Sequence, residues 1–486
     1  MFVDLDPGDV TEGPLVRALV LTAAPLLVQN VVQVGQQLVD LLFLGRFSAA
    51  AVSGVALATP LVGLLIVASV AGMVGAQVLV AQHVGGDEPA AARRLGLAAL
   101  LAAGVLAVGI GTAGTALARP VLRALLALQP GVAGGGGTDQ VLRFATDYVA
   151  VYGVGLLGVT LADTLEGVYL GWGDSRAALY MNVAAVGLNA LLDPLLIFGY
   201  GPIPQLGAGG AAAATVVGYT VGSLCLGVVL VARGRHGGVI RVPRGGPVDG
   251  TPDRWPTVGD VRAILSTGLP IGGREALRQT FRLAMVALAY VAGGPAALAA
   301  YLVGARVATV AFVPANGLQQ AAQSVGGQNV GADRLDRARR TTWIGAGLIA
   351  ATLALVGVGQ WLVPGPIVRA VAPELAPDAV AYAVEYLRIL AYGYPALGAL
   401  YLFESGFNAA DRTRVTAVTT LLQYGAVRVP IAAAGVLALG GDATVVFWAV
   451  TASNVAAAVG LGAYYRASVV GGMLRRASRS AGSAGD

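Results

Sequence analysis

Residues 81–94 read AQHVGGDEPAAARR and residues 327–340 read GQNVGADRLDRARR, so that seven of the fourteen aligned positions are identical. Two further pairs align in the same order at similar offsets: Pro25 with Pro270, and Asp174 with Asp411. Three ordered matches indicate an internal duplication rather than chance similarity. The chain is therefore expected to fold as two structurally equivalent halves.

The composition places both halves in a membrane. The chain of 486 residues is 56% hydrophobic and 12% charged, with a mean hydropathy of +0.73, whereas a soluble domain is typically about 25% charged. These values exclude most soluble enzymes, disordered proteins and nearly all nucleic-acid binders. One cysteine and two histidines exclude a disulfide framework and a histidine-rich metal site.

Long stretches with few charges predict membrane-spanning helices, because one span needs about 20 mostly apolar residues. The expected fold class is an all-α polytopic membrane protein with twelve transmembrane helices in two six-helix repeats, an N-lobe and a C-lobe, around a central cavity. The predicted spans are residues 18–43, 51–82, 95–118, 148–171, 177–199, 208–232, 264–292, 296–325, 341–368, 382–409, 415–437 and 444–465. The predicted organisation is an N-terminus at 1–14, an N-lobe at 15–232, a linker at 233–262, a C-lobe at 263–466 and a C-terminal tail at 467–486.

The arginines predict the orientation of these spans. If both termini are cytoplasmic, 20 arginines fall in cytoplasmic segments and 5 in outer loops. Such a bias is typical of cytoplasmic loops and fits an even number of helices. We therefore expect a multi-pass protein of the cytoplasmic membrane with both termini, the linker and the tail inside.

Charges inside spans mark candidate sites, because each costs about 2.5–3.5 kcal/mol on insertion scales. In the N-lobe these charges are all acidic: Asp40, Asp163, Glu166 and Asp193. Acids that face a cavity without basic partners are natural sites for H⁺, Na⁺ or a cationic substrate.

Two pairs of polar residues share helix faces in the N-lobe. Asn189 and Asp193 are four residues apart, and Gln33 and Asp40 are seven apart. If the first and fifth helices face each other, these side chains form one cluster whose oxygens suit a hard cation or a proton. The alternative is a hydrogen-bonded helix-packing network without an ion.

The C-lobe carries both signs of charge within its spans. Glu275 and Arg278 are neighbours on one helix, and Glu404 could meet Arg428 on the next helix. Neutralisation of buried charge and a polar gate or second coupling site are both open. In the N-lobe, Pro25 permits a kink in the first helix, either static or bending when a nearby acid is protonated.

No Walker A, Gly-x-Ser-x-Gly or His-Glu-x-x-His motif occurs, so neither ATP hydrolysis nor another enzyme activity is expected. Energy for transport would then come from an ion gradient. The expected partners are small organic substrates and the lipid bilayer, with no nucleic acid, no cofactor and a monomeric state.

Four segments resemble the multidrug and toxic compound extrusion (MATE) family, in the wider group that includes polysaccharide and lipid flippases. They are residues 22–57 (TAAPLLVQNVVQVGQQLVDLLFLGRFSAAAVSGVAL), 167–199 (GVYLGWGDSRAALYMNVAAVGLNALLDPLLIFG), 206–217 (LGAGGAAAATVV) and 325–340 (VGGQNVGADRLDRARR). The resemblance covers roughly residues 15–466. It implies an antiporter that exports organic, often cationic, compounds in exchange for H⁺ or Na⁺.

The resemblance also implies a cation site in the N-lobe. Its matching residues are Asp40, Asn189 and Asp193, with Gln33 beside them and Ala211 and Thr215 on the sixth helix. Tyr148 matches a tyrosine near the substrate pocket, to which we also assign Asp163 and Glu166. Glu275 departs from the family pattern because it follows Pro270 by only five residues, so the N-lobe site is favoured, as in the archaeal and DinF-like branch.

The resulting hypothesis is alternating access driven by the cation site. An outward-facing state would bind H⁺ or Na⁺ at Asp40, Asn189 and Asp193, bend the first helix at Pro25 and expel the drug. The runner-up is a flippase for a lipid-linked saccharide or another amphipathic lipid, whose phosphates would bind the C-lobe arginines.

Overall fold

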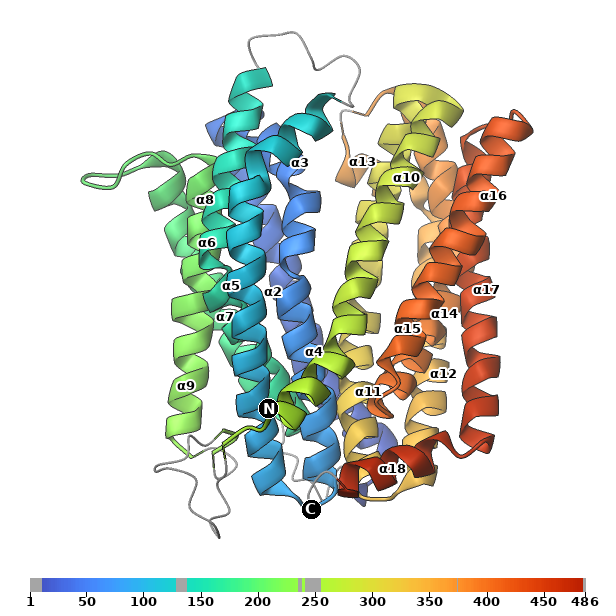
Figure 1. Ribbon diagram of the computed structural model, residues 1–486. Helices are drawn as coiled ribbons and strands as arrows, with labels where there is room; N and C mark the ends of the chain where they lie inside the picture. Colours follow the sequence, from blue (N-terminus) through green and yellow to red (C-terminus); the bar gives the residue numbers. More distant parts are fainter. Residues whose placement is uncertain (1–10, 128–137, 235–237, 241–254, 374, 484–486) are drawn as a thin grey trace. The chain divides into compact units, whose positions relative to one another are not determined.

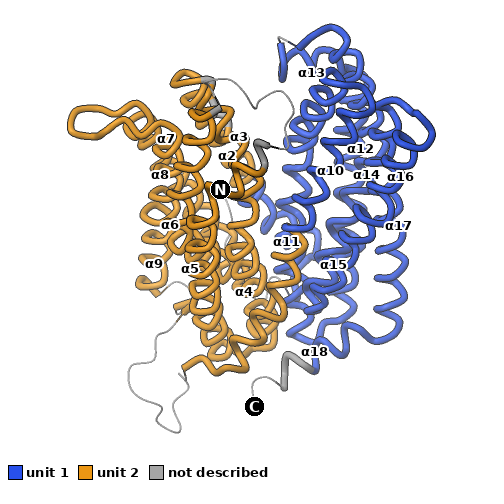
Figure 2. The backbone as a smooth tube through the Cα atoms, turned by 45° about the horizontal axis from the view of Figure 1, so that its top comes forward, with its two compact units in different colours: residues 1–27, 276–486 blue, residues 28–275 orange. Residues whose placement is uncertain are grey.

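The computed structural model describes residues 11–127, 138–234, 238–240, 255–373 and 375–483, which form helices joined by turns and contain no strand (Figure 1). The chain divides into two compact units (Figure 2). Unit 2 is Val28–Glu275, and unit 1 combines Met1–Leu27 with Ala276–Asp486. The boundaries of the units therefore lie inside helices and not in the predicted linker.

Unit 2 is built from the helices of the first half of the chain. They are α3 (Ala49–Leu65), α4 (Val67–Gly85), α5 (Pro89–Ala127), α6 (Thr138–Gly171), α7 (Ser175–Phe198), α8 (Ala208–Val217), the π-helix η1 (Gly218–Leu224) and α9 (Cys225–Ala232). Two helices, α2 (Leu15–Phe47) and α10 (Val258–Ala311), each contribute residues to both units.

Unit 1 is built from the helices of the second half. They are α11 (Val313–Gly331), α12 (Leu335–Leu362), α13 (Pro364–Val371), α14 (Pro377–Ala409), α15 (Thr413–Thr420), the π-helix η3 (Leu421–Arg428), α16 (Val429–Ala433), the π-helix η4 (Ala434–Ala438), α17 (Ala443–Val470) and α18 (Met473–Ser483).

The described helices account for the predicted spans. Ten are long and apolar enough to cross a bilayer. One of them, α10, contains two spans. Gly293 and Gly294 break it between the predicted seventh and eighth spans, and Gly294 has φ 63° and ψ −154°. Positive φ favours glycine, which has no Cβ to clash. With α14 as the tenth span, the twelve-helix expectation is confirmed within the described chain.

The duplicated motif adopts the same backbone in both halves. Asp87 and Asp333 occupy equivalent positions and are both left-handed, with φ of 59° and 56°. In each turn the aspartate N–H donates to the carbonyl three residues earlier, and the next N–H donates to the carbonyl five residues earlier, at 2.8–3.2 Å. These bonds satisfy the last carbonyls of the preceding helix. The two halves therefore repeat both the amino-acid sequence and the backbone structure of this turn.

A second pair of turns corrects one expected alignment. Gly173 (φ 83°) and Asp411 (φ 53°) are the left-handed residues of equivalent turns. The alignment of Asp174 with Asp411 is therefore wrong by one residue. Asp174 instead caps α7, since its Oδ1 accepts a hydrogen bond from the N–H of Ala177 at 3.0 Å.

Small residues allow the helices of unit 2 to approach closely. A Cβ at Gly167 of α6 would meet the backbone of Met73 in α4, and a Cβ at Gly72 would meet the Thr164 side chain. These glycines fix α6 against α4 next to Glu166, which is 6% exposed.

The predicted eleventh span combines α-helical and π-helical turns. Pro430 lies at the start of α16, directly after the π-helix η3. Proline lacks an N–H and its ring clashes with the carbonyl four residues earlier, so the preceding turn widens. The π-helix η3 carries Gln423, Tyr424 and Arg428.

The predicted terminal and linker segments are described only in part. Residues 1–10, 241–254 and 484–486, which belong to the predicted N-terminus, linker and tail, lie outside the described residues. The end of the linker forms the start of α10, where Asp260 pairs with Arg94 of α5 at 3.2 Å. The tail contains α18, which buries Met473, Leu474 and Ala477 and exposes its arginines.

Candidate cation-binding site

One face of α2 is polar although the helix is apolar as a whole. Gln29, Gln33, Gln36 and Asp40 follow each other at spacings of four, three and four residues, which places them on one side of the helix. Gln29 and Gln36 are 4% and 9% exposed. The sequence analysis named only Gln33 and Asp40, although the same spacing would have identified the other two glutamines.

The helix α7 contributes two side chains that are sealed from solvent. Asn189 and Asp193 are four residues apart and both 0% exposed. Asn182, seven residues before Asn189 on the same face, is also 0% exposed. Buried polar groups in proteins almost always have hydrogen-bond partners, so a polar group on this face that lacks one is a candidate for binding a ligand.

The amide of Asn189 links α2 to α8. In the orientation that satisfies its neighbours, its nitrogen donates to Asp40 Oδ1 at 3.1 Å and its oxygen accepts from the Thr215 N–H at 3.2 Å. The same nitrogen lies 3.0 Å from Nε2 of Gln36. The structure thus brings together the first and fifth predicted helices, as the sequence analysis assumed.

The carboxylate of Asp193 completes the cluster. Neither of its oxygens has a hydrogen-bond partner among the described residues, and its carboxyl group interacts directly with that of Asp40. Two buried carboxyl groups at close range require a proton or a metal cation between them. The described residues contain no group of three or more His, Cys, Asp or Glu that could hold a metal.

The sixth predicted helix supplies further oxygens at the cluster. The Thr215 hydroxyl donates to the Ala211 carbonyl at 3.1 Å. A Cβ at Gly218 would lie 3.1 Å from Cβ of Asn189 and 2.6 Å from the Ala185 carbonyl, so glycine permits η1 to lie against α7 here. Together the set offers carboxylate, amide, hydroxyl and carbonyl oxygens, which suit H⁺ or Na⁺.

Aromatic side chains pack together near the end of α2 that follows Asp40. Phe47 packs edge-on against Phe144 and Phe198, with ring centroids 5.9 and 6.2 Å apart. Tyr148 packs against the same cluster and lies within electrostatic range of Asp40 and Asp193.

Asp163 and Glu166 lie at a second polar cluster. Gln29 Nε2 donates to Glu166 Oε1 at 2.6 Å, while Gln29 Oε1 has no partner among the described residues. Tyr148 is on the same helix but 18 residues from Glu166, about 27 Å along the axis. The three residues assigned to one substrate pocket therefore lie in two separate places. Tyr219 of η1, near Gln33, Asp163 and Glu166, lies between the two clusters.

Of the two predicted C-lobe pairs, the one between Glu404 and Arg428 does not form. Arg428 bonds to Ser453 and to Asn454 of α17, and its guanidinium carbon lies 3.9 Å from the centre of the Tyr424 ring. Its partners therefore do not include Glu404, which accepts a hydrogen bond from Gln319 at 3.2 Å. Glu275 and Arg278 lie three residues apart within α10, and their pairing stays a prediction. Pro25 lies inside α2, which continues through it as a helix.

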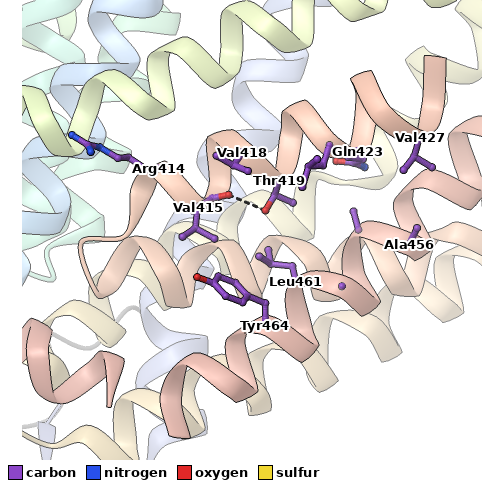
Figure 3. A pocket seen from close by; sticks show the side chains of 12 residues that line it. Arg414, Val415, Val418, Thr419, Gln423, Val427, Ala456, Leu461 and Tyr464 are labelled. Carbon is purple, nitrogen blue, oxygen red and sulfur yellow. Dashed lines mark hydrogen bonds between the residues drawn. The ribbon is translucent and has the colours of Figure 1, made fainter. Parts of the chain in front are cut away.

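A groove of about 530 Å³ lies in unit 1 between α15–η3 and α17. Its wall is largely apolar, with Val418 and Leu461 facing the space (Figure 3). Gln423 is the polar residue of the wall that also belongs to the hydrogen-bonded network of Arg428, because its Nε2 donates to Asn454 Oδ1 at 2.8 Å.

Comparisons with known proteins give one consistent family. The family model described as MatE matches residues 25–195 and 270–434, more than half of the chain. The chain is 28% identical over 362 residues to a probable multidrug resistance protein NorM of Thermotoga maritima, covering 74% of this chain and 73% of the relative. It is 25% identical over 427 residues to a probable multidrug resistance protein YpnP of Bacillus subtilis, covering 87% and 89%.

The fold is also shared with solved structures. One is described as an outward-facing conformation of a multidrug resistance MATE family transporter of the MOP superfamily. It superposes with a TM-score of 0.83 at 19% sequence identity, covering 96% of this chain and 99% of the other. At that identity the likeness concerns the fold alone.

Proposed function

The chain belongs to the MatE family of membrane transporters, and from that premise we propose that it is an ion-coupled multidrug exporter. Because members of this family are transporters, the chain is not an enzyme. The proposed reaction is the exchange of a small organic cation for H⁺ or Na⁺. The names of the two relatives, both probable multidrug resistance proteins, support export of drugs.

A single observation carries the coupling proposal. Asp193 is fully buried, both of its oxygens lack a partner among the described residues, and it faces a second acid, Asp40. A cation would supply the missing interaction, and its departure would leave two buried negative charges in contact. The free energy of this site therefore depends strongly on occupancy, as ion coupling requires.

The proposed cycle uses the site as a switch. Cation binding from the outside neutralises Asp40 and Asp193 and favours bending of α2 at Pro25, which expels the drug. Release of the cation to the cytoplasm restores the state that binds drug. The arginine distribution supports a cytoplasmic-membrane location with both termini inside, and we propose that the monomer is the working unit.

Dye transport in proteoliposomes tests this function. A fluorescent organic cation is loaded, and a pH gradient and a Na⁺ gradient are imposed separately. Transport under one gradient, lost in Asp40→Asn and Asp193→Asn, is the expected result. The matched control is Asp139→Asn, which changes an exposed acid at the start of α6. Wild-type transport in both site variants would contradict the proposal.

The second candidate function is a flippase for a lipid-linked saccharide. The observation that favours it is the pair Arg282 and Arg428 in unit 1, for which the described residues provide no carboxylate partner. Phosphate groups are preferred ligands of arginine. Absence of dye transport under both gradients, together with translocation of a phosphate-bearing lipid, would favour this function.

A further inference from the structure

We propose that Arg428, with Arg282 and Tyr424, forms an anion-binding site in unit 1 that holds a carboxylate or phosphate group of the exported compound. This use of the site in export rests on the proposed function, whereas the binding itself does not. The exported compounds would then carry an anionic group in addition to a cationic one.

The burial of Arg428 is the first argument. Its residue is 6% exposed, inside a helix that is apolar enough to cross a bilayer. All of its partners are neutral: the hydroxyl of Ser453, at 2.8 Å from Nε, the amide oxygen of Asn454, and the ring of Tyr424. Within the described chain no carboxylate lies at ion-pair distance. A buried charge without a counter-charge is costly and is a functional-site candidate in a membrane protein.

The guanidinium retains the capacity to bind a ligand. An arginine has five N–H donors in a planar fork. Arg428 donates from Nε to Ser453 and from Nη2 to Asn454, and it also hydrogen-bonds to the Tyr424 side chain. These three bonds leave N–H donors of the fork for a ligand. A carboxylate or phosphate oxygen is the preferred acceptor for such a donor.

A second arginine, Arg282, lies near Tyr424. Phe281 of α10 stacks on Tyr424 with ring centroids 6.1 Å apart. Arg282, the next residue, is exposed and has no carboxylate partner among the described residues. Arg278 and Arg282 both act electrostatically on Tyr424. Three arginines therefore act on one tyrosine, and one of them, Arg282, is exposed.

The surroundings hold Arg428 in place. Gln423, one of the residues that line the groove (Figure 3), donates to Asn454, which also accepts from Arg428. Ser453 is fixed by its own bond to the Val450 carbonyl at 2.8 Å. A site whose donors are already oriented loses little entropy when it binds a ligand.

Buried aromatic rings pack near this cluster. Tyr386 stacks between Tyr301 and Phe447, with centroid distances of 5.6 and 4.3 Å. These rings interact with the same cluster, because Tyr301 and Tyr386 both lie within electrostatic range of Arg428.

The internal repeat gives an independent argument. The offset that aligns Pro25 with Pro270 also aligns Gln33 with Arg278 and Gln37 with Arg282. The polar face of α2 thus carries glutamines and an acid, while the equivalent face of α10 carries arginines. At these positions the second repeat carries positive charge where the first carries neutral glutamines, while the same offset places Met285 opposite Asp40.

Equilibrium binding to purified protein tests the proposal. The probes are a zwitterionic fluoroquinolone, which carries an amine and a carboxylate, and its methyl ester, which keeps only the amine. In nanodiscs of neutral lipid the wild-type protein is expected to bind the acid roughly tenfold or more tightly than the ester. Equal affinity of the wild type for both probes would overturn the proposal without any variant.

Arginine variants test which side chains cause the tighter binding of the acid. Arg428→Gln should abolish it, Arg282→Gln should reduce it severalfold, and Arg428→Lys should restore part of it because the charge remains without the planar fork. Arg388→Gln, an exposed arginine that packs on Trp361 of the same unit, is the control and should bind like wild type. If Arg428→Gln does not fold, Arg282→Gln decides, since that side chain is exposed. An unchanged preference in Arg282→Gln and in every folded Arg428 variant would overturn the proposal.

Two further measurements distinguish a lipid-binding site from a site for an exported compound, and the binding proposal from the exporter proposal. If phosphatidylglycerol displaces the acid from wild-type protein but not from Arg282→Gln, the site belongs to a lipid headgroup and the assignment to an exported compound is wrong. Failure of the wild type to transport a purely cationic dye would refute the proposed exporter function, whereas the difference in binding between acid and ester would remain.

Discussion

Asn189 shows how one side chain can organise a cation site. Its amide bridges Asp40 on α2 and Thr215 on α8, and it has no exposed surface. An amide can donate and accept at once, so it orients a carboxylate and a backbone N–H together. Neither a hydrophobic nor a charged residue can make both contacts.

We expect Asn189→Ala to weaken both coupling and stability. Loss of the bridge leaves buried partners unsatisfied, which costs about 1–3 kcal/mol, and cation affinity should fall roughly tenfold. The measurement is the rise in melting temperature as Na⁺ is added or the pH is lowered. Thr112→Val, which removes only bonds within one exposed helix, is the control. A cation-dependent shift equal to that of wild type would contradict the role of Asn189.

Gln29 and Glu166 give a second prediction at the residue scale. Their 2.6 Å hydrogen bond joins α2 to α6 in a buried place, so removal of either partner should be costly. Gln29→Leu and Glu166→Leu should each destabilise the protein, and the double variant should be less destabilised than the sum by about 0.5–3 kcal/mol. Additive losses in thermal or denaturant unfolding would show that the contact contributes nothing specific.

At the element scale, two of the π-helices in the described chain, η1 and η3, coincide with the two polar sites. The π-helix η1 carries Tyr219 beside the acids of unit 2, and η3 carries Tyr424 and Arg428 in unit 1. A π turn shifts the side chains that follow it around the helix axis, and such turns are frequent at functional sites. The hydropathy of these segments predicts helices but does not predict this shift.

The contact of η1 with α7 depends on Gly218. We expect Gly218→Ala to abolish cation-coupled transport while helix content is retained, because the added Cβ would lie 2.6 Å from the Ala185 carbonyl and separate η1 from Asn189. Gly187→Ala on α7, where a Cβ meets nothing within 4 Å, should transport like wild type. Proteoliposome transport and circular dichroism make the comparison, and normal transport by Gly218→Ala would refute the packing argument.

At the scale of the whole molecule, each unit uses a segment from the other half of the chain. In unit 1, Arg337 of α12 donates to the Gly13 carbonyl at 2.8 Å. In unit 2, Asp260 pairs with Arg94, and Ile271 packs with Val74 and Val78. The halves of the sequence are therefore not the compact units of the structure.

This exchange predicts the behaviour of a divided chain. Cutting within residues 241–254 separates the sequence halves, but each half then lacks a segment of its own unit, residues 11–27 for one and 258–275 for the other. We expect neither half alone to be stable, and we expect the co-expressed halves to restore transport. Stable, monodisperse protein from either half alone would contradict the exchange.

The sequence by itself determined the membrane class, the twelve spans, the duplication and the helix faces that carry the acids. These follow from local composition and from spacing along one helix, which act before helices meet. The break at Gly293 and Gly294 was predictable for the same reason.

The tertiary structure decided which faces meet. It placed Gln29 on Glu166 and Gln36 beside Asn189, separated Tyr148 from Glu166, and gave Arg428 neutral partners in place of Glu404. Partners on different helices depend on helix rotation and on close approach at glycines, and a single sequence does not encode these in any local pattern. The chemistry of each side chain was therefore readable from the sequence, whereas its partner was set by packing.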